Sequence, residues 1–231
     1  MYRPKPSNFH PFEGYTNDFV KDFFALSLVS FAYVNFFKIN KIKSFDTLKS
    51  FVRSGAYTDK TELLDFLKNN PELATNSLID YILISISFEN YFKAKLLLKG
   101  YLIHEIIKEK NVELFKRQRK EPIESRFITF ETKDKSSELK ENTLNYELLL
   151  KNKKYSRLYD LDDITLEFLS ILNKKRNNLH LYMSEKFELS NAEINNLEKL
   201  KKIVEYDFAT LNNHLIDKMG GQSNSRIIIK K

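Results

Sequence analysis

Apolar residues recur every three to four positions along most of the chain, and the breaks between these stretches are short. Such spacing gathers the apolar side chains on one face of a helix, so each periodic stretch predicts a helix that packs against others. The predicted helices cover approximately residues 18–42, 59–69, 73–110, 138–151, 163–180 and 191–218. In residues 126–132 apolar and polar residues alternate instead, which allows a brief strand.

Capping residues support two of these helix starts. Asp162 or Asp163 begins the helix that ends near residue 180, and Ser190 with Glu193 forms a capping box before the last helix. The inward side of the helix after Asp163 is expected to carry Ile164, Phe168, Ile171 and Leu172. The chain has only 5 glycines and 5 prolines in 231 residues. Because these residues interrupt helices, their scarcity predicts an all-α protein.

The segment from Phe23 to Phe37 carries no charged residue, so a membrane span has to be weighed against a buried helix. A span needs roughly 20 apolar residues, which is more than this segment has. Lys21, Asp22 and Lys38 also bracket it closely. A helix buried on most sides is therefore expected, with no membrane as partner.

The formal net charge is +7, and the chain has no cysteine. A basic chain favours a polyanionic partner such as nucleic acid, although many basic proteins bind none. The lack of cysteine excludes disulfides, cysteine nucleophiles and thiolate metal sites, and it agrees with a cytoplasmic protein.

Arg176 and His180 form the candidate site. They lie four positions apart and therefore share one face of a helix. A guanidinium binds phosphate through several donors and an imidazole transfers protons near neutral pH, so the pair suits a phosphodiester. Asn177 and Asn178 would orient the pair or contact the backbone of a ligand. Such a pair also arises by chance, which leaves surface or capping roles as the alternative.

Three further polar features lie upstream. Glu89 stands among apolar residues, and Lys93 is its nearest candidate partner; an ordinary exposed pair is the alternative. The basic run Lys116–Lys120 is either solvated or helps to hold a phosphate backbone. His104 is expected to be structural, because nothing near it in the sequence suggests a partner for proton transfer.

Three of these stretches together resemble the HEPN family of helical domains. Residues 89–106, ENYFKAKLLLKGYLIHEI, are similar to the long HEPN helix, and residues 161–180, LDDITLEFLSILNKKRNNLH, are similar to the helix that ends in an arginine, a polar residue and a histidine. The closing helix follows. The resemblance covers residues 73–218 and implies an antiparallel helical bundle of HEPN type. It leaves residues 1–72 as an N-terminal tail and helical extension, and residues 219–231 as a flexible C-terminal tail.

The resemblance also implies a function. Active HEPN domains are metal-independent endoribonucleases without a cofactor, and they form homodimers in which the motifs of the two protomers share one cleft. The ribose 2′-hydroxyl attacks the neighbouring phosphorus, so DNA would be left uncut. By this resemblance Arg176 binds the phosphate, Asn177 is the polar neighbour, and His180 is the general acid or base, with Glu89 and Lys93 in support. The implied setting is antiphage defence or a toxin–antitoxin system.

The spacing of the motif departs from the family's pattern, which places four to six residues between arginine and histidine. Only Asn177, Asn178 and Leu179 intervene in this chain. One residue fewer turns a group on a helix by about 100°. The site therefore requires that the helix loosens near Asn178, that the shorter spacing is a tolerated variant, or that Lys175 takes the cationic role.

Tyr182 carries a second resemblance. In toxins paired with minimal nucleotidyltransferases, the partner adenylylates a tyrosine two residues after the histidine, and His180-Leu181-Tyr182 is similar to that pattern. This implies modification at Tyr182 and a nucleotidyltransferase or another antitoxin as partner. A core or stacking tyrosine is the alternative.

Three functional hypotheses follow. The first is a homodimeric endoribonuclease acting on RNA. The second is a non-catalytic HEPN module that binds RNA, a nucleotide or a protein partner. The third is an interaction scaffold whose N-terminal helices dock on a larger complex, which an exposed aromatic patch in residues 23–37 would favour.

Overall fold

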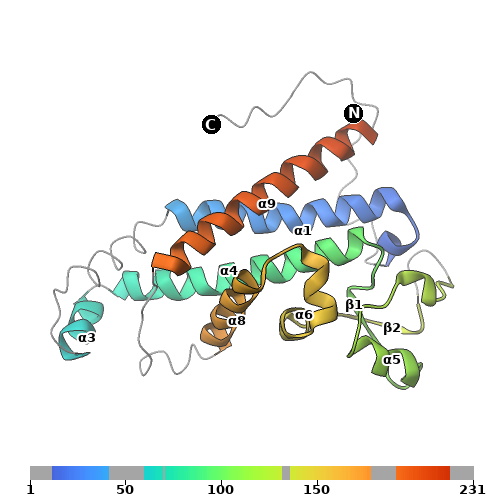
Figure 1. Ribbon diagram of the computed structural model, residues 1–231, viewed down its shortest axis with the longest axis horizontal. Coiled ribbons are helices and arrows are strands. Elements are labelled where there is room, and N and C mark those ends of the chain that lie inside the picture. The colour runs from blue at the N-terminus through green and yellow to red at the C-terminus, as the bar shows by residue number, and fades with distance from the viewer. Residues whose placement is uncertain (1–11, 42–59, 70, 132–135, 178–190, 219–231) are drawn as a thin grey trace.

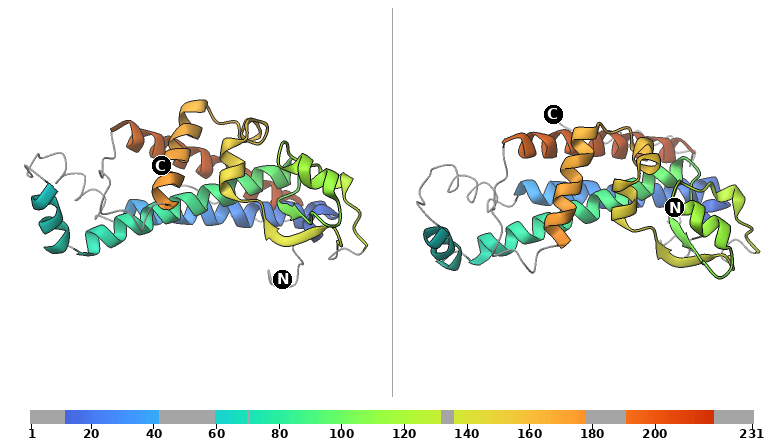
Figure 2. Two further views of the ribbon diagram at one scale, coloured as in Figure 1. Left: turned by 90° about the horizontal axis from the view of Figure 1, so that it is seen from below. Right: turned by 60° about the horizontal axis from the view of Figure 1, so that its bottom comes forward.

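The structure is a computed structural model that describes residues 12–41, 60–69, 71–131, 136–177 and 191–218 (Figure 1). The described chain is predominantly helical. Helix α1 (Asp18–Lys41) runs alongside α4 (Pro71–Leu98) in the opposite direction, and α9 (Asn191–Lys218) lies across α1 (Figures 1 and 2). Tyr91 and Lys95 link α4 to α9, because both contact the carboxylate of Asp207 on α9 at 2.6 Å.

Shorter elements complete the fold. The helices are α3 (Lys60–Asn69), α5 (Val112–Gln118), α6 (Tyr146–Lys151), α7 (Lys153–Ser156) and α8 (Asp163–Asn177), and the 3-10 turns are η2 (Glu13–Tyr15), η3 (Ser125–Phe127) and η4 (Arg157–Tyr159). Strands β1 (His104–Ile106) and β2 (Leu139–Thr143) pair antiparallel, with His104 opposite Thr143 and Ile106 opposite Leu139. The sheet and α5 gather at one end of the molecule, whereas α8 lies near its middle (Figures 1 and 2).

The main core lies where α1, α4, α6, α8 and α9 meet, and it is rich in aromatic side chains. Phe92 of α4 is fully buried, and its ring stacks on that of Tyr159 with the centroids 3.9 Å apart. A second, smaller core lies beneath the sheet. Its buried members are Phe12, Leu102, Ile106, Ile123, Ile128 and Leu139.

Helix α1 belongs to the main core. Its buried residues include Val20, Ala25, Val29 and Ala32, and it contacts both α4 and α9 along its length. Phe31 is exposed at 44%, next to Val34 at 47%. Helix α1, which precedes residue 72, thus shares a core with helices that follow it. The predicted domain boundaries stay a prediction.

The predicted helices at residues 18–42, 59–69 and 191–218 are confirmed, but the one at 73–110 is too long. Helix α4 ends at Leu98, and Gly100 follows in the left-handed conformation with φ +80. Gly100 N–H donates to the Leu97 carbonyl and Tyr101 N–H to the Leu96 carbonyl, which closes the helix as a Schellman motif. Only glycine takes this backbone conformation without strain, so the chain turns here and continues into β1.

The prediction of one helix over residues 138–151 is also wrong in its first half. Residues 139–143 form β2, and α6 begins at Tyr146 after Asn145, whose side chain accepts the N–H of Leu148. The brief strand allowed at residues 126–132 is not present in the described part of that range, where η3 covers Ser125–Phe127. The pairing partner of β1 thus comes from a segment more than 30 residues away rather than from its sequence neighbours.

The capped start of α8 is confirmed, with Asp162 as the capping residue. Its Oδ1 accepts the N–H of Thr165 at 2.8 Å, and its carboxylate also pairs with Lys199 of α9. Hydrogen bonds from Lys199 and Thr165 lower the pKa of the Asp162 carboxyl to about 2.

The inward face of α8 differs from the predicted one. Phe168 and Leu172 are buried as expected, but Ile164 is 69% exposed and Ile171 38% exposed. The residues that face the core are Thr165, Phe168, Leu169, Leu172 and Asn173. The steps from residue 165 to 169, 172 and 176 follow helical spacing, so the core-facing stripe continues to Arg176.

Replacing Asp162 by alanine is expected to lower the free energy of unfolding by about 1 kcal/mol at neutral pH, because the first turn of α8 loses its cap. The carboxyl pKa is depressed on folding, so its charge stabilises the fold above the ordinary value of 3.8, and this contribution is lost as the pH falls towards about 2. Urea unfolding at several pH values measures both effects. Asp162→Asn is the control, since the amide still caps the helix without the charge; equal stability of the alanine variant and wild type would contradict the assignment.

Candidate functional site

Arg176 lies near the end of α8 and faces Glu89 on α4. Its Nη1 lies 3.8 Å from Glu89 Oε2, and the two side chains are 31% and 22% exposed. This separation is within ion-pair range but longer than a hydrogen bond. The Glu89 carboxylate therefore attracts the Arg176 guanidinium electrostatically, but the N–H groups of the guanidinium do not form a hydrogen bond with it.

Lys93 completes the cluster from within α4. Its Nζ donates to Glu89 Oε1 at 2.6 Å and to Thr143 Oγ1 at 2.8 Å, and its side chain is only 7% exposed. The contact expected between Glu89 and Lys93 is present, and the pair is not an ordinary exposed one. Glu89 thus stands between two cations that come from different helices.

Tyr146 on α6 brings a hydroxyl to the same place. Its oxygen is buried and has no hydrogen-bond partner among the described residues. Burial raises the pKa of this phenol well above its ordinary value; the nearby Glu89 raises it further, while Arg176 opposes the shift. Sequence reasoning missed both Thr143 and Tyr146. Thr143 lies in β2, which was predicted as helix, and Tyr146 lies in α6, whose contact with this cluster depends on how α4, α6 and α8 pack.

The remaining predicted site residues fall at the edge of the described chain or beyond it. Lys175 and Asn177 belong to α8, which ends at Asn177. Asn178, His180 and Tyr182 lie outside the described residues. The structure therefore brings Arg176, Glu89 and Lys93 together, and the proposed pairing of Arg176 with His180 stays a prediction.

His104 lies in β1 rather than in a helix, and it is buried at 4% exposure. The hydroxyl oxygen of Tyr15 accepts the N–H groups of Ile103 and His104, so its own proton points to Nδ1 of His104 at 2.6 Å. The edge of Phe12 packs against the imidazole ring with the centroids 4.9 Å apart. This environment suits the structural role expected for His104, and Tyr15 is a partner that sequence reasoning missed.

The cluster formed by Glu89, Lys93 and Arg176 has a clear chemical capacity. Two cations against one carboxylate leave it net positive, and Arg176 is its most exposed member. A guanidinium held in place by a carboxylate behind it is preorganised to bind an oxyanion in front. The cluster is thus equipped to bind a phosphate group at the end of α8.

Within the described ranges no helix is both apolar and long enough to cross a membrane, and no three histidine, aspartate or glutamate side chains are grouped to hold a metal ion. Comparison with family models, with curated proteins and with solved structures finds no significant match. The resemblance to the HEPN family accordingly stays a prediction.

Replacing Glu89 by alanine is expected to lower the free energy of unfolding by about 2–3 kcal/mol, because the nearly buried Lys93 ammonium loses its counterion. Thermal or urea unfolding measures the loss. Glu147 and Lys151 on α6 form the matched control, since this pair has the same spacing but is more than half exposed. Glu147→Ala is expected to leave stability nearly unchanged; equal effects of the two substitutions would show that the Glu89 pair is not a buried one.

Proposed function

We propose that this chain is a homodimeric endoribonuclease of HEPN type that cleaves RNA without a metal ion, in antiphage defence or a toxin–antitoxin system. The observation that carries the proposal is the meeting of Arg176 with Glu89 and Lys93. It brings together Glu89 and Arg176, which are 87 positions apart and belong to the two stretches that resemble HEPN motif helices. Arg176 lies on the core-facing stripe of α8, and His180 follows one helical turn later in the sequence.

The proposed reaction uses the ribose as nucleophile. His180 takes the proton of the 2′-hydroxyl, whose oxygen then bonds to phosphorus while the bond from phosphorus to the 5′-oxygen breaks. The leaving oxygen takes up a proton, so the products are a 2′,3′-cyclic phosphate and a 5′-hydroxyl. Arg176 stabilises the negative charge on the phosphoryl oxygens, with Glu89 fixing the direction of its guanidinium. Lys175, Asn177 and Asn178 are proposed to contact the substrate.

The purified full-length chain, incubated with a labelled RNA in the presence of a chelator, tests the proposal. Cleavage is expected, and it should stop when the nucleotide 5′ to the cut is replaced by its 2′-deoxy analogue, because the nucleophile is then missing. Cleavage of the deoxy-substituted strand at the same position, or no cleavage of any RNA at a range of protein concentrations, would refute the proposed reaction.

One observation favours the second candidate, a non-catalytic module that binds RNA, a nucleotide or a protein. Arg176 is already paired with a carboxylate and is 31% exposed, so its charge is partly used within the protein. This candidate predicts binding that weakens as salt rises and leaves the RNA intact. The same incubation separates the two, since intact RNA that is nevertheless retained by the protein identifies the module. Modification of Tyr182 by a nucleotidyltransferase belongs to the nuclease proposal alone.

A further inference from the structure

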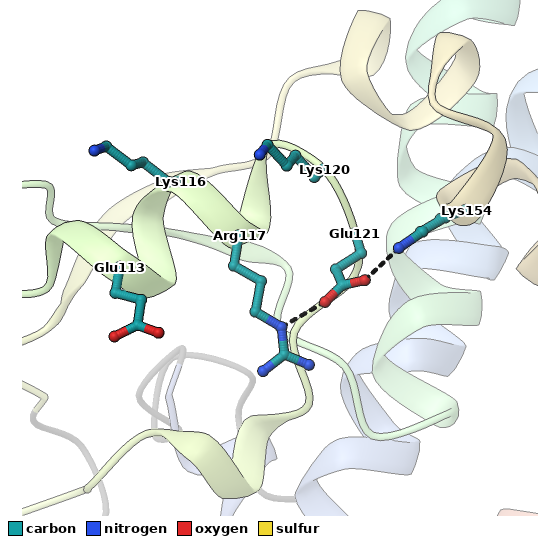
Figure 3. Close-up of a pocket in the computed structure, with 6 residues that line it drawn as sticks. All are labelled: Glu113, Lys116, Arg117, Lys120, Glu121 and Lys154. Atoms are coloured by element: carbon teal, nitrogen blue, oxygen red, sulfur yellow. Dashed lines mark hydrogen bonds and ion pairs between the residues drawn. The ribbon is translucent and has the colours of Figure 1, made fainter.

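A basic pocket of about 280 Å³ lies on the surface between α5 and α7 (Figure 3). We call it the α5 pocket. Its lining consists of four cations and two carboxylates, namely Lys116, Arg117, Lys120, Lys154, Glu113 and Glu121. The lining is thus net positive, and it includes three cations of the basic run at residues 116–120.

Two of these cations are available to a ligand. Lys116 and Lys120 have no carboxylate within ion-pair distance among the described residues, and both side chains are exposed. They are four positions apart, Lys116 in α5 and Lys120 just after its end, and both line the same pocket as Glu113 and Arg117 (Figure 3). Spaced cations of this kind suit the phosphates of a polyanion rather than a single carboxylate.

The other two cations are held in place. Glu121 Oε1 pairs with Arg117 Nε and its Oε2 with Lys154 Nζ, each at 2.5 Å (Figure 3). Hydrogen bonds from Lys154 and Arg117 lower the pKa of the Glu121 carboxyl to about 2, so it stays ionised at any physiological pH. Glu121 therefore links Arg117 of α5 to Lys154 of α7 at one side of the pocket.

An exposed aromatic ring adjoins the pocket. Phe127 in η3 is 44% exposed, and the guanidinium carbons of Arg117 and Arg126 lie 5.2 and 5.4 Å from its centroid. Arg117 thus belongs both to the pocket lining and to this aromatic site. Rings and guanidinium planes are the surfaces on which unpaired bases stack.

We propose that the α5 pocket and Phe127 together bind a single-stranded nucleic acid, with Lys116 and Lys120 contacting backbone phosphates while a base stacks on Phe127. Cations that contact the backbone, together with an exposed ring, are typical of sites for single strands, since a duplex does not offer a free base face. The proposal rests on the proposed function only in naming RNA as the natural strand. Neither contact uses the 2′-hydroxyl, so single-stranded DNA of the same sequence is expected to bind as well.

Fluorescence anisotropy of a labelled single-stranded DNA, which the proposed nuclease cannot cut, tests the site on the full-length chain. Lys116→Gln with Lys120→Gln is expected to weaken binding about tenfold and to reduce the slope of log affinity against log salt by about 1.4, because each lysine–phosphate contact contributes about 0.7. The control is Lys108→Gln with Lys110→Gln, which removes the same charge from exposed positions outside the pocket. Equal losses in the two double variants would overturn the proposal.

Phe127→Ala is expected to weaken binding of the single strand about fivefold or more and to leave binding of the matching duplex unchanged. Phe31→Ala on α1 is its control, because Phe31 has the same 44% exposure and is not part of the α5 pocket lining. Loss of duplex and single-strand binding alike, or displacement of the strand by ATP at equal phosphate concentration, would contradict the stacking site. These measurements concern binding alone and do not depend on RNA cleavage. Absence of cleavage would contradict the proposed function but not the binding site.

Discussion

Replacing His180 by alanine is expected to slow RNA cleavage by about 100- to 10,000-fold, which is the usual contribution of a positioned acid or base. The substitution removes the group proposed to accept the proton of the 2′-hydroxyl. Initial rates of product formation with a labelled RNA measure the loss, and circular dichroism with thermal unfolding establishes that the variant keeps its fold. In cells, the growth defect expected on induction of the wild-type chain should disappear.

Three further variants extend this test. His214→Ala removes an exposed histidine on α9, 3.3 Å from Asp22, and should leave cleavage unchanged. Arg176→Gln is expected to slow cleavage by about 100- to 1,000-fold, since it removes a donor to the developing charge. Arg176→Lys keeps the charge without the planar fork and should restore only part of the rate. Cleavage by His180→Ala at the wild-type rate would exclude the proposed role of this histidine.

Replacing Phe92 by alanine is expected to lower the free energy of unfolding by about 3–5 kcal/mol, the largest stability loss predicted for this chain. Phe92 is fully buried, stacks on Tyr159 and lies near the rings of Phe88 and Tyr146. The substitution removes these contacts and leaves a cavity at the junction of α4, α6 and η4. Urea unfolding followed by circular dichroism measures the loss.

The control for Phe92 is Phe31→Ala, which deletes the same side chain from an exposed position on α1. Its effect on the free energy of unfolding is expected to stay within about 0.5 kcal/mol, because the ring is already solvated on one side. A loss for Phe92→Ala no larger than that for Phe31→Ala would mean that the aromatic cluster does not form the centre of the core.

The bounds of several helices could be predicted because their signals are local. Apolar spacing identified α1, α3 and α9, and the capped start of α8 at Asp162 was predicted as one of two adjacent candidates. The end of α4 was also encoded locally, in Gly100, but the apolar residues on both sides outweighed a single glycine in the prediction. The end of α4 was thus predicted wrongly although the sequence contains a local signal for it.

The strands could not be predicted in the same way. Residues 139–143 become β2 because residues 104–106 lie beside them, and these segments are separated by a helix and a turn. A short strand gains its hydrogen bonds only from its partner, so its own sequence carries little information about it. Thr143 reaches Lys93 for this reason, and it does so from a stretch predicted to be helical.

For the candidate site, the sequence by itself determined the pairing of Glu89 with Lys93, since residues one helical turn apart meet on any helix. It also determined a helical, basic chain with an arginine near the end of a capped helix. Only the tertiary structure decided that Arg176 faces Glu89, that Tyr146 is buried beside them, and that Phe127 adjoins the α5 pocket. These contacts join positions far apart in the chain, and they form because burial of the shared core fixes how α4, α6 and α8 pack, which no local spacing specifies.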